Sequence, residues 1–181
     1  MDNYQYLLVK NYEELLNHLN NGLHKTFGNC FGTSSHYNEK EWDDFDNVKK
    51  VFEDYLRKRG IIYLCGDENK VVGFTAAVPL LTEKERYEEL KNNLDEASKY
   101  WYIGDLGVHI DYRNNKIGEE LLKHIFKNIP VKNVILRTRK DNERAIKWYL
   151  KQGFEYHTGV NEVTIISTTE GDERVFMKKT I

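Results

Sequence analysis

Cysteine and proline are scarce in this sequence, and long apolar runs are absent. Its 181 residues contain two cysteines, Cys30 and Cys65, and two prolines. Two cysteines cannot build a disulfide scaffold, and neither has a second cysteine at the spacing of a zinc site, so we expect no metal. No apolar run reaches the length that spans a bilayer. These absences exclude a disulfide-stabilised small domain and a membrane-spanning protein.

An excess of one charge is also missing. The chain has 27 Lys and Arg against 29 Asp and Glu, a net charge of −2. Bulk positive charge lets a protein coat nucleic acid or an anionic membrane, so we expect neither as a partner. The first residues lack the basic and apolar regions of an export signal, and the two cysteines are typical of reduced thiols. We therefore expect a cytoplasmic protein.

A regular order of helices and strands is predicted along the chain. Apolar residues recur at helical spacing over 13–19, 46–59, 115–129 and 142–152. A polar, glycine-containing loop is expected over 27–42. We expect one domain over 1–181, with a helical part at 1–60, a β-hairpin at 61–80, a helix at 83–99, a core at 100–157 and strands at 158–181. This order is typical of a mixed α/β sheet.

The strand expected over 100–110 contains an irregularity. Before Gly104 the more apolar positions are odd-numbered, Trp101 and Ile103, and after it they are even-numbered. Because the side chains of a strand alternate with a period of two, this switch predicts a β-bulge at Gly104 and Asp105. A bulge there would spread the neighbouring strands beside a ligand.

A candidate anion-binding loop lies between this strand and the next helix. The free N–H groups at a helix start carry partial positive charge, which favours a phosphate. The loop has two basic side chains, Arg113 and Lys116, and Gly118 lets the backbone approach a ligand closely. The alternative is an ordinary strand-to-helix connection with solvated basic residues. The patterns of nucleotide P-loops and dinucleotide sites are absent.

A second candidate group lies on the helix at 142–152. Asn142 stands where an N-cap is expected, and capping alone is a sufficient role for it. Tyr149 shares an apolar helix face, so it can equally be a core aromatic residue. Two polar-tipped side chains two turns apart on a helix can also both reach along one extended ligand.

Together these segments resemble the GNAT superfamily of acetyl-CoA-dependent N-acyltransferases. The segment from Val108, V-H-I-D-Y-R-N-N-K-I-G-E-E-L-L, is similar to the family's acyl-CoA motif, R/Q-x-x-G-x-G/A. The segment from Asn142, N-E-R-A-I-K-W-Y-L-K-Q-G-F, resembles N-x-x-A-x-x-x-Y-x-x-x-G-F, and R-V-F-M-K-K-T-I resembles the family's last strand. The resemblance implies a mixed, mostly antiparallel sheet of six to seven strands, flanked by helices, with a splayed central strand pair.

The resemblance also implies roles for individual residues. Acetyl-CoA would be the cosubstrate, with its pantetheine arm along the backbone of Leu106, Gly107 and Val108. The Val108 amide would polarise the thioester carbonyl, Asn142 would bind the pantetheine arm, and Tyr149 would protonate the departing thiolate. The pyrophosphate would be held by the amides of Arg113, Asn114, Asn115, Lys116, Ile117 and Gly118. Lys116 replaces the family's first glycine, and these amides remain suitable if Lys116 takes a helical conformation.

The sequence also suggests a general base and a kind of acceptor. Asp105 is the best candidate base, because it is an acidic residue at the bulge of an otherwise apolar strand; a structural carboxylate is the alternative. Tyr102 and His109 are further candidates. The acidic residues of the helix at 83–99 favour a cationic acceptor, unless they form a solvated face that the basic residues of that helix offset.

The function that fits is transfer of an acetyl group from acetyl-CoA to a primary amine by direct attack in a ternary complex. The amine can belong to a small molecule, a peptide or a lysine side chain. The alternative is a non-catalytic acyl-CoA sensor or interaction module on the same fold, which the retained Asn142 and Tyr149 disfavour. The apolar strand at 163–167 can pair edge to edge in a homodimer.

Overall fold

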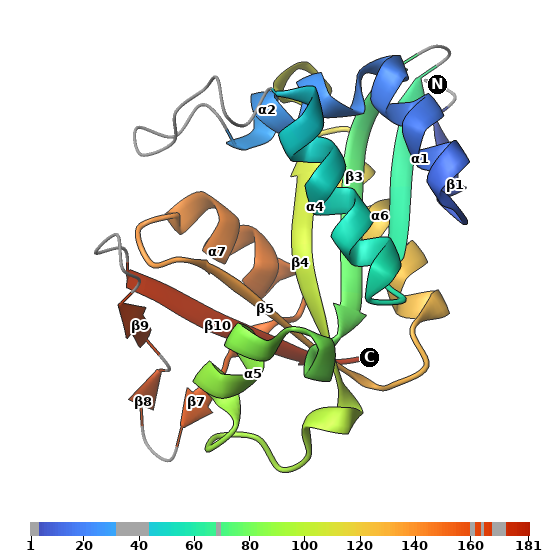
Figure 1. The fold of residues 1–181 in the computed structure, drawn as a ribbon. Helices are drawn as coiled ribbons and strands as arrows, with labels where there is room; N and C mark the ends of the chain where they lie inside the picture. Colours follow the sequence, from blue (N-terminus) through green and yellow to red (C-terminus); the bar gives the residue numbers. More distant parts are fainter. Residues whose placement is uncertain (1–3, 32–43, 68–69, 160–161, 164, 168–172) are drawn as a thin grey trace. The chain divides into compact units, whose positions relative to one another are not determined.

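The computed structural model describes residues 4–31, 44–67, 70–159, 162–163, 165–167 and 173–181 (Figure 1). The chain divides into two compact units, of which the first comprises Met1–Ala77 and Asp105–Asn128, and the second comprises Val78–Gly104 and Ile129–Ile181. That the two units act as one domain over 1–181 stays a prediction. No helix in the described ranges is long and apolar enough to cross a membrane.

The first unit is built on an antiparallel arrangement of strands. In spatial order these are β1 (Gln5–Leu8), β2 (Ile61–Asp67), β3 (Lys70–Pro79) and the second half of β4 (Tyr100–Val108). The end of β4 is tied to β3 where the His109 amide donates to the Val72 carbonyl at 2.9 Å. Residues 71–78 of β3 are all buried, as expected for a strand covered on both faces. The predicted hairpin of β2 and β3 is confirmed.

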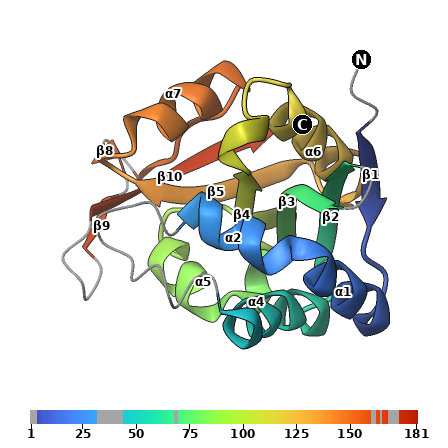
Figure 2. The ribbon, with the colours of Figure 1, turned by 90° about the horizontal axis from the view of Figure 1, so that it is seen from above.

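Helices cover both faces of this sheet (Figure 2). They are α1 (Tyr12–His18), α2 (His24–Phe31), α4 (Phe45–Arg57) and α6 (Ile117–Asn128), and a π-helical turn, Leu19–Leu23, joins the first two. Figure 2 shows α1 and α4 on one face and α6 on the other. Phe27 of α2, Phe52 of α4 and Phe74 of β3 are fully buried, and their rings pack against one another with centroids 5.2–5.8 Å apart.

The described residues of the N-terminal part are mostly helical, as expected, but two features differ from the prediction. A strand, β1, lies within the region expected to be helical, and it pairs with β2 over four residues. The helix α2 occupies 24–31, where the loop over 27–42 was expected to begin. Gly28 suggested a loop, but it is buried inside α2, where a small residue permits close packing. The remainder of that loop, 32–43, lies outside the described residues.

The second unit contains the first half of β4, followed in spatial order by β5 (Asn133–Arg139), β10 (Glu173–Thr180) and β6 (Glu155–Tyr156). A further strand, β9 (Ile165–Ser167), also pairs with β10, and β7 (Thr158–Gly159) pairs with β8 (Glu162–Val163). The helices are α5 (Lys84–Leu90) and α7 (Glu143–Lys151), which lie on opposite faces of β5 and β10 (Figure 2). A homodimer through the strand at 163–167 stays a prediction.

The expected fold class is confirmed. The pairs of the main sheet are antiparallel, except that β4 and β5 run parallel, with residues 100–103 opposite 133–136. This parallel register stops one residue before Gly104, which agrees with the expected splayed strand pair. The register shift that the structure records lies between Cys65 and Gly66 of β2, whereas the bulge at Gly104 and Asp105 stays a prediction.

The helix expected over 83–99 is much shorter than predicted. α5 ends at Leu90, and only a 3-10 turn, Ala97–Lys99, follows before β4. Asn92, Asn93 and Asp95 stand in the interval, and their short polar side chains compete with the helix for backbone hydrogen bonds. The helix therefore ends at Leu90, whose side chain is buried in the core, and the charged residues that follow do not extend it.

Candidate functional site

The loop before α6 has a conformation that exposes helix-start amides. A 3-10 turn, Ile110–Tyr112, follows β4, and Asn114 and Lys116 then adopt left-handed φ values of 71° and 60°. The Glu120 amide donates to the Lys116 carbonyl at 3.1 Å. The amides of Ile117, Gly118 and Glu119 precede this bond and therefore have no partner within the helix. Such a helix start can bind an anion.

Lys116 therefore does not take the helical conformation that was the condition for these amides to remain suitable. A right-handed helical residue has φ near −60°, whereas Lys116 lies in the left-handed region that glycine adopts without strain. The family resemblance places glycine at this position. Lys116 thus reproduces the backbone shape of the motif, although its side chain makes that shape more costly for this chain.

Neighbouring side chains hold this loop in place. Arg113 Nε donates to the Val108 carbonyl at 3.1 Å, so its guanidinium is directed toward the strand rather than held only in solvent. Asn115 Nδ2 donates to the Tyr4 hydroxyl at 3.2 Å. The ammonium group of Lys70 lies 5.0 Å from the ring centroid of Tyr112. These contacts organise the loop from three separate segments of the first unit.

The strand residues expected to face the pantetheine arm, 106–108, have a tightly packed glycine at their centre. A Cβ atom at Gly107 would lie 2.5 Å from Phe74 Cζ and 2.8 Å from Cys30 Sγ, closer than real Cβ contacts. Leu106 and Val108 on either side are partly exposed. Burial raises the pKa of the Cys30 thiol to about 12, although nearby Arg113 opposes the shift. Cys30 is therefore a packing residue rather than a nucleophile.

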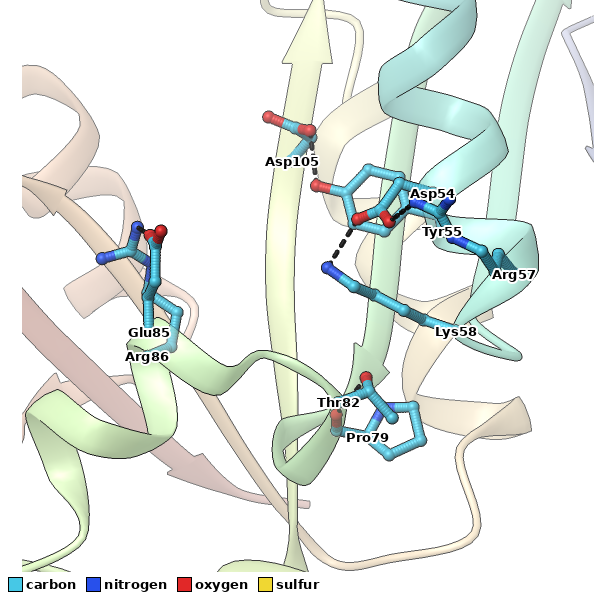
Figure 3. A network of polar contacts seen from close by, with 9 residues as sticks. All are labelled: Asp54, Tyr55, Arg57, Lys58, Pro79, Thr82, Glu85, Arg86 and Asp105. Atoms are coloured by element: carbon cyan, nitrogen blue, oxygen red, sulfur yellow. Dashed lines mark hydrogen bonds and ion pairs between the residues drawn. The ribbon is translucent and has the colours of Figure 1, made fainter.

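Asp105 has a side-chain partner that sequence reasoning missed. The hydroxyl of Tyr55 donates to Asp105 Oδ2 at 2.6 Å, and Figure 3 shows the two side chains meeting from α4 and β4. The Thr75 hydroxyl also donates to the Asp105 carbonyl at 3.1 Å. Tyr55 is buried, and it lies in the helix expected over 46–59. A buried phenol hydroxyl needs a hydrogen-bond partner, and this was the only signal in the sequence that could have indicated the contact.

The other candidate bases have different surroundings. His109 caps the 3-10 turn, with its Nδ1 accepting from the Asp111 amide at 3.4 Å. Burial lowers the pKa of His109, and the positive charge of Lys70 lowers it further. Tyr102 is buried in the first half of β4, in the second unit. In the described ranges, no group of three His, Cys, Asp or Glu side chains is arranged to hold a metal ion.

Asn142 and Tyr149 both lie on α7 in the second unit. Asn142 Oδ1 accepts from the Ala145 amide at 3.1 Å, so its capping role is confirmed. The Tyr149 ring is half-buried, and it meets the rings of Trp148 and Phe154 edge to face, with centroids 5.2 and 5.5 Å away. The helix ends before Gly153, whose left-handed φ of 80° suits glycine.

The predicted site residues therefore form two groups. Asp105, the strand residues 106–108 and the loop 113–118 belong to the first unit, and they are brought together by the end of β4. Asn142 and Tyr149 belong to the second unit. The binding and catalytic roles of both groups stay predictions.

The acidic residues near α5 do not form a free anionic surface. Arg86 contacts Glu85 at 2.8 Å and Glu89 at 2.6 Å, and Lys91 contacts Glu88 at 2.5 Å. After the helix, Lys99 contacts Glu96 at 3.0 Å. These pairs agree with the alternative in which basic residues offset the acidic ones, and the charge of the acceptor stays a prediction.

Comparison with known proteins shows the family to which this chain belongs. The protein-family model described as "Acetyltransferase (GNAT) family" matches residues 17–154. No curated protein sequence gives a significant match. The structure of ribosomal-protein-S18-alanine N-acetyltransferase from Escherichia coli is 17% identical, with a TM-score of 0.63, and the match covers 98% of this chain and 94% of that chain.

Two further solved structures share the fold. PaiA N-acetyltransferase from Thermoplasma acidophilum, in complex with coenzyme A, is 16% identical with a TM-score of 0.62, covering 98% of this chain and 99% of that chain. N-acetyltransferase from Staphylococcus aureus Mu50 is 14% identical with a TM-score of 0.69, covering 98% of each chain. At such identities, the likeness concerns the fold alone.

Proposed function

Because the chain belongs to the acetyltransferase (GNAT) family, we propose that it transfers the acetyl group of acetyl-CoA to a primary amine by direct attack in a ternary complex. The observation that carries this proposal is the loop before α6, where two left-handed residues precede helix-start amides that have no partner within the helix. The S18-alanine N-acetyltransferase and PaiA, which share the fold, support an amine acceptor and coenzyme A binding by analogy.

The residues of this loop fit the pyrophosphate of coenzyme A. Amide N–H groups and the helix dipole favour negative charge at the start of α6, which is 12 residues long. Of the expected amides 113–118, that of Arg113 already donates to the Ile110 carbonyl at 3.3 Å, so we assign the pyrophosphate to the amides of residues 114–118, with Lys116 adding a positive charge. The pantetheine arm would lie along residues 106–108 and bind Asn142, whose capping bond uses Oδ1. Acetyl-CoA supplies the activated acetyl thioester.

The reaction requires two proton movements that this chain can perform. The attacking amine must be neutral, and Asp105 is the proposed acceptor of its proton. As the new C–N bond forms and the C–S bond breaks, the Val108 amide would stabilise the negative oxygen. Tyr149 would donate its phenolic proton to the departing thiolate, which leaves as the free thiol of coenzyme A. The extra proton on the newly bonded nitrogen would then be lost through solvent and restore the Tyr149 phenol. Each role is implied by the family resemblance; Asp105 and Val108 lie on β4, and Tyr149 lies on α7.

Two variants test the proposal. Tyr149→Phe keeps the ring contacts with Trp148 and Phe154, and we expect it to lower kcat about 100-fold or more without weakening coenzyme A binding. Asp105→Asn should lower the rate most at low pH, where the free amine is scarcest. Acetyl transfer is followed by release of the coenzyme A thiol, and binding by calorimetry. Undiminished turnover in Tyr149→Phe would reject the acid, and binding without turnover in the wild type would indicate a non-catalytic sensor.

A further inference from the structure

Arg137 is a cation in the middle of β5 whose hydrogen-bonding capacity is little used. Its side chain is only 16% exposed, yet among the described residues its hydrogen bonding consists of one long contact, from Nη1 to Glu89 Oε1 at 3.4 Å. A guanidinium has five N–H donors in a rigid fork. A half-buried arginine with so few partners is unusual, because burying charge is costly unless it is paired.

The carboxylate beside Arg137 is shared with a second arginine. Arg86, which is 15% exposed, donates to the same Glu89 Oε1 at a shorter distance of 2.6 Å. Arg86 also contacts Glu85, but that carboxylate is 82% exposed and therefore strongly screened. The buried layer thus holds two guanidinium groups against the single carboxylate of Glu89. An excess positive charge remains in this layer.

The surroundings of Arg137 agree with a local excess of positive charge, although Arg139 nearby is paired with Asp141 through hydrogen bonds of 2.9 and 2.6 Å. Burial lowers the pKa of Arg137, and the neighbouring charges of Arg86 and Arg174 lower it further, although Tyr102 and Glu89 act in the opposite direction. Arg174 is opposite Arg139 in the antiparallel pair of β10 and β5. Because Arg139 and Arg137 are two residues apart on one strand, all three arginines face the same side of the sheet.

The network is also poorly arranged for a purely structural ion pair. Glu89 Oε2 is buried and, within the described part of the chain, receives no hydrogen bond. A structural pair would be expected to use both carboxylate oxygens, as bidentate arginine–carboxylate pairs do. Here both arginines contact the same oxygen, Glu89 Oε1, at unequal distances. The remaining N–H groups of Arg137 are left for another anion.

Arg137 directly follows Leu136, where the parallel register of β4 and β5 ends, so it lies where the expected splay of this strand pair begins. We propose that Arg137, assisted by Arg86, binds a carboxylate or phosphate group carried by the acyl acceptor. This inference rests on the proposed function, and it reverses the cationic acceptor expected from the acidic residues of 83–99. An arginine fork matches both anions geometrically, and the low dielectric of a half-buried layer strengthens the attraction. The acceptor would then be an amine that also carries an anionic group, such as an amino acid or a phosphorylated amine.

The first experiment measures anion binding without any acetyl transfer. Inorganic phosphate is titrated into the protein saturated with coenzyme A, which fills the loop before α6, and the arginine Nε–Hε resonances are followed by NMR. We expect the resonance that is missing in Arg137→Gln to shift in the wild type. Affinity should fall about tenfold or more in Arg137→Gln, because charge-assisted hydrogen bonds are lost. Glu89→Gln, which removes the competing carboxylate, should tighten binding.

A matched control separates this site from general electrostatics. Lys147→Gln removes one positive charge from an exposed pair with Glu143 in the same unit, and it should leave phosphate affinity unchanged. Arg137→Lys keeps the charge but loses the fork, and should bind with intermediate affinity. Equal phosphate affinity in the wild type and Arg137→Gln would overturn the inference, as would weaker binding in Glu89→Gln.

A second arm connects the site to the acceptor. Pairs of amines that differ only by a carboxylate, such as an amino acid and its decarboxylated amine, are compared as acceptors. Arg137→Gln should raise KM about tenfold for the carboxylated member and leave the other unchanged. Equal effects on both members would reject an acceptor-binding role. Failure to acetylate any amine would reject the proposed function instead, whatever the phosphate titration shows.

Discussion

Replacing Gly107 by alanine is expected to destabilise the first unit. The added Cβ would meet Phe74 Cζ at 2.5 Å and Cys30 Sγ at 2.8 Å, and Phe74 is fully buried against Phe27 and Phe52. A close-packed aromatic cluster has no free volume into which the ring can move. Overpacking of this kind costs about 1–3 kcal/mol, which corresponds to a fall in Tm of about 3–10 °C for a chain of this length.

Gly66→Ala supplies the control for this measurement. A Cβ at Gly66 would be 3.8 Å from the Lys70 carbonyl oxygen, an ordinary van der Waals contact, so little change in stability is expected. Thermal unfolding of both variants is followed by circular dichroism, and coenzyme A affinity is measured alongside. If Gly107→Ala unfolds at the same temperature as Gly66→Ala, the close packing of β4 against Phe74 and Cys30 is wrong.

Two further predictions concern the loop before α6 and the thiol beneath it. Lys116→Gly relieves about 1–2 kcal/mol of strain from the left-handed backbone. Glycine loses more conformational entropy on folding, which costs about 0.5–1 kcal/mol. Because the relief exceeds this cost, denaturant unfolding should show equal or higher stability. Its coenzyme A affinity should fall about fivefold at most, through the loss of one exposed positive charge, and a loss of more than about tenfold would contradict binding mainly through the amides. Because the pKa of Cys30 is raised to about 12, its stabilising contribution holds at neutral pH and is lost as the pH rises toward that value. Mass spectrometry after iodoacetamide treatment at pH 8 should find Cys30 unmodified in the folded protein, and rapid labelling would contradict this.

Strong local patterns predicted much of the fold. The sequence predicted both the apolar face of α6 and the capped start of α7 at Asn142. Both were predictable because helical periodicity and capping depend on residues within one or two turns. The short edge strand β1 was not readable, because its four residues show no alternation of burial. The excess length expected for α5 came from helix propensity alone, which tertiary packing overrides.

The candidate site was predicted less completely, because its chemistry depends on contacts between distant segments. Tyr55 and Asp105 are 50 residues apart in the sequence, so the residues around either one do not predict their hydrogen bond. The left-handed backbone of Lys116 contradicts the ordinary preference of lysine and was foreseeable only from the family's glycine at that position. Likewise, the charges of 83–99 suggested an anionic surface until the structure paired Glu89 with Arg86 and Arg137.

The most direct test of the account combines acetyl-CoA with a panel of amines, peptides and amino acids. Release of the coenzyme A thiol is monitored, and the acceptor is examined by mass spectrometry. We predict that thiol release depends on the acceptor and that one acceptor gains the mass of a single acetyl group. Absence of coenzyme A binding at about millimolar concentration, the weak end of specific affinities, would contradict the central claim.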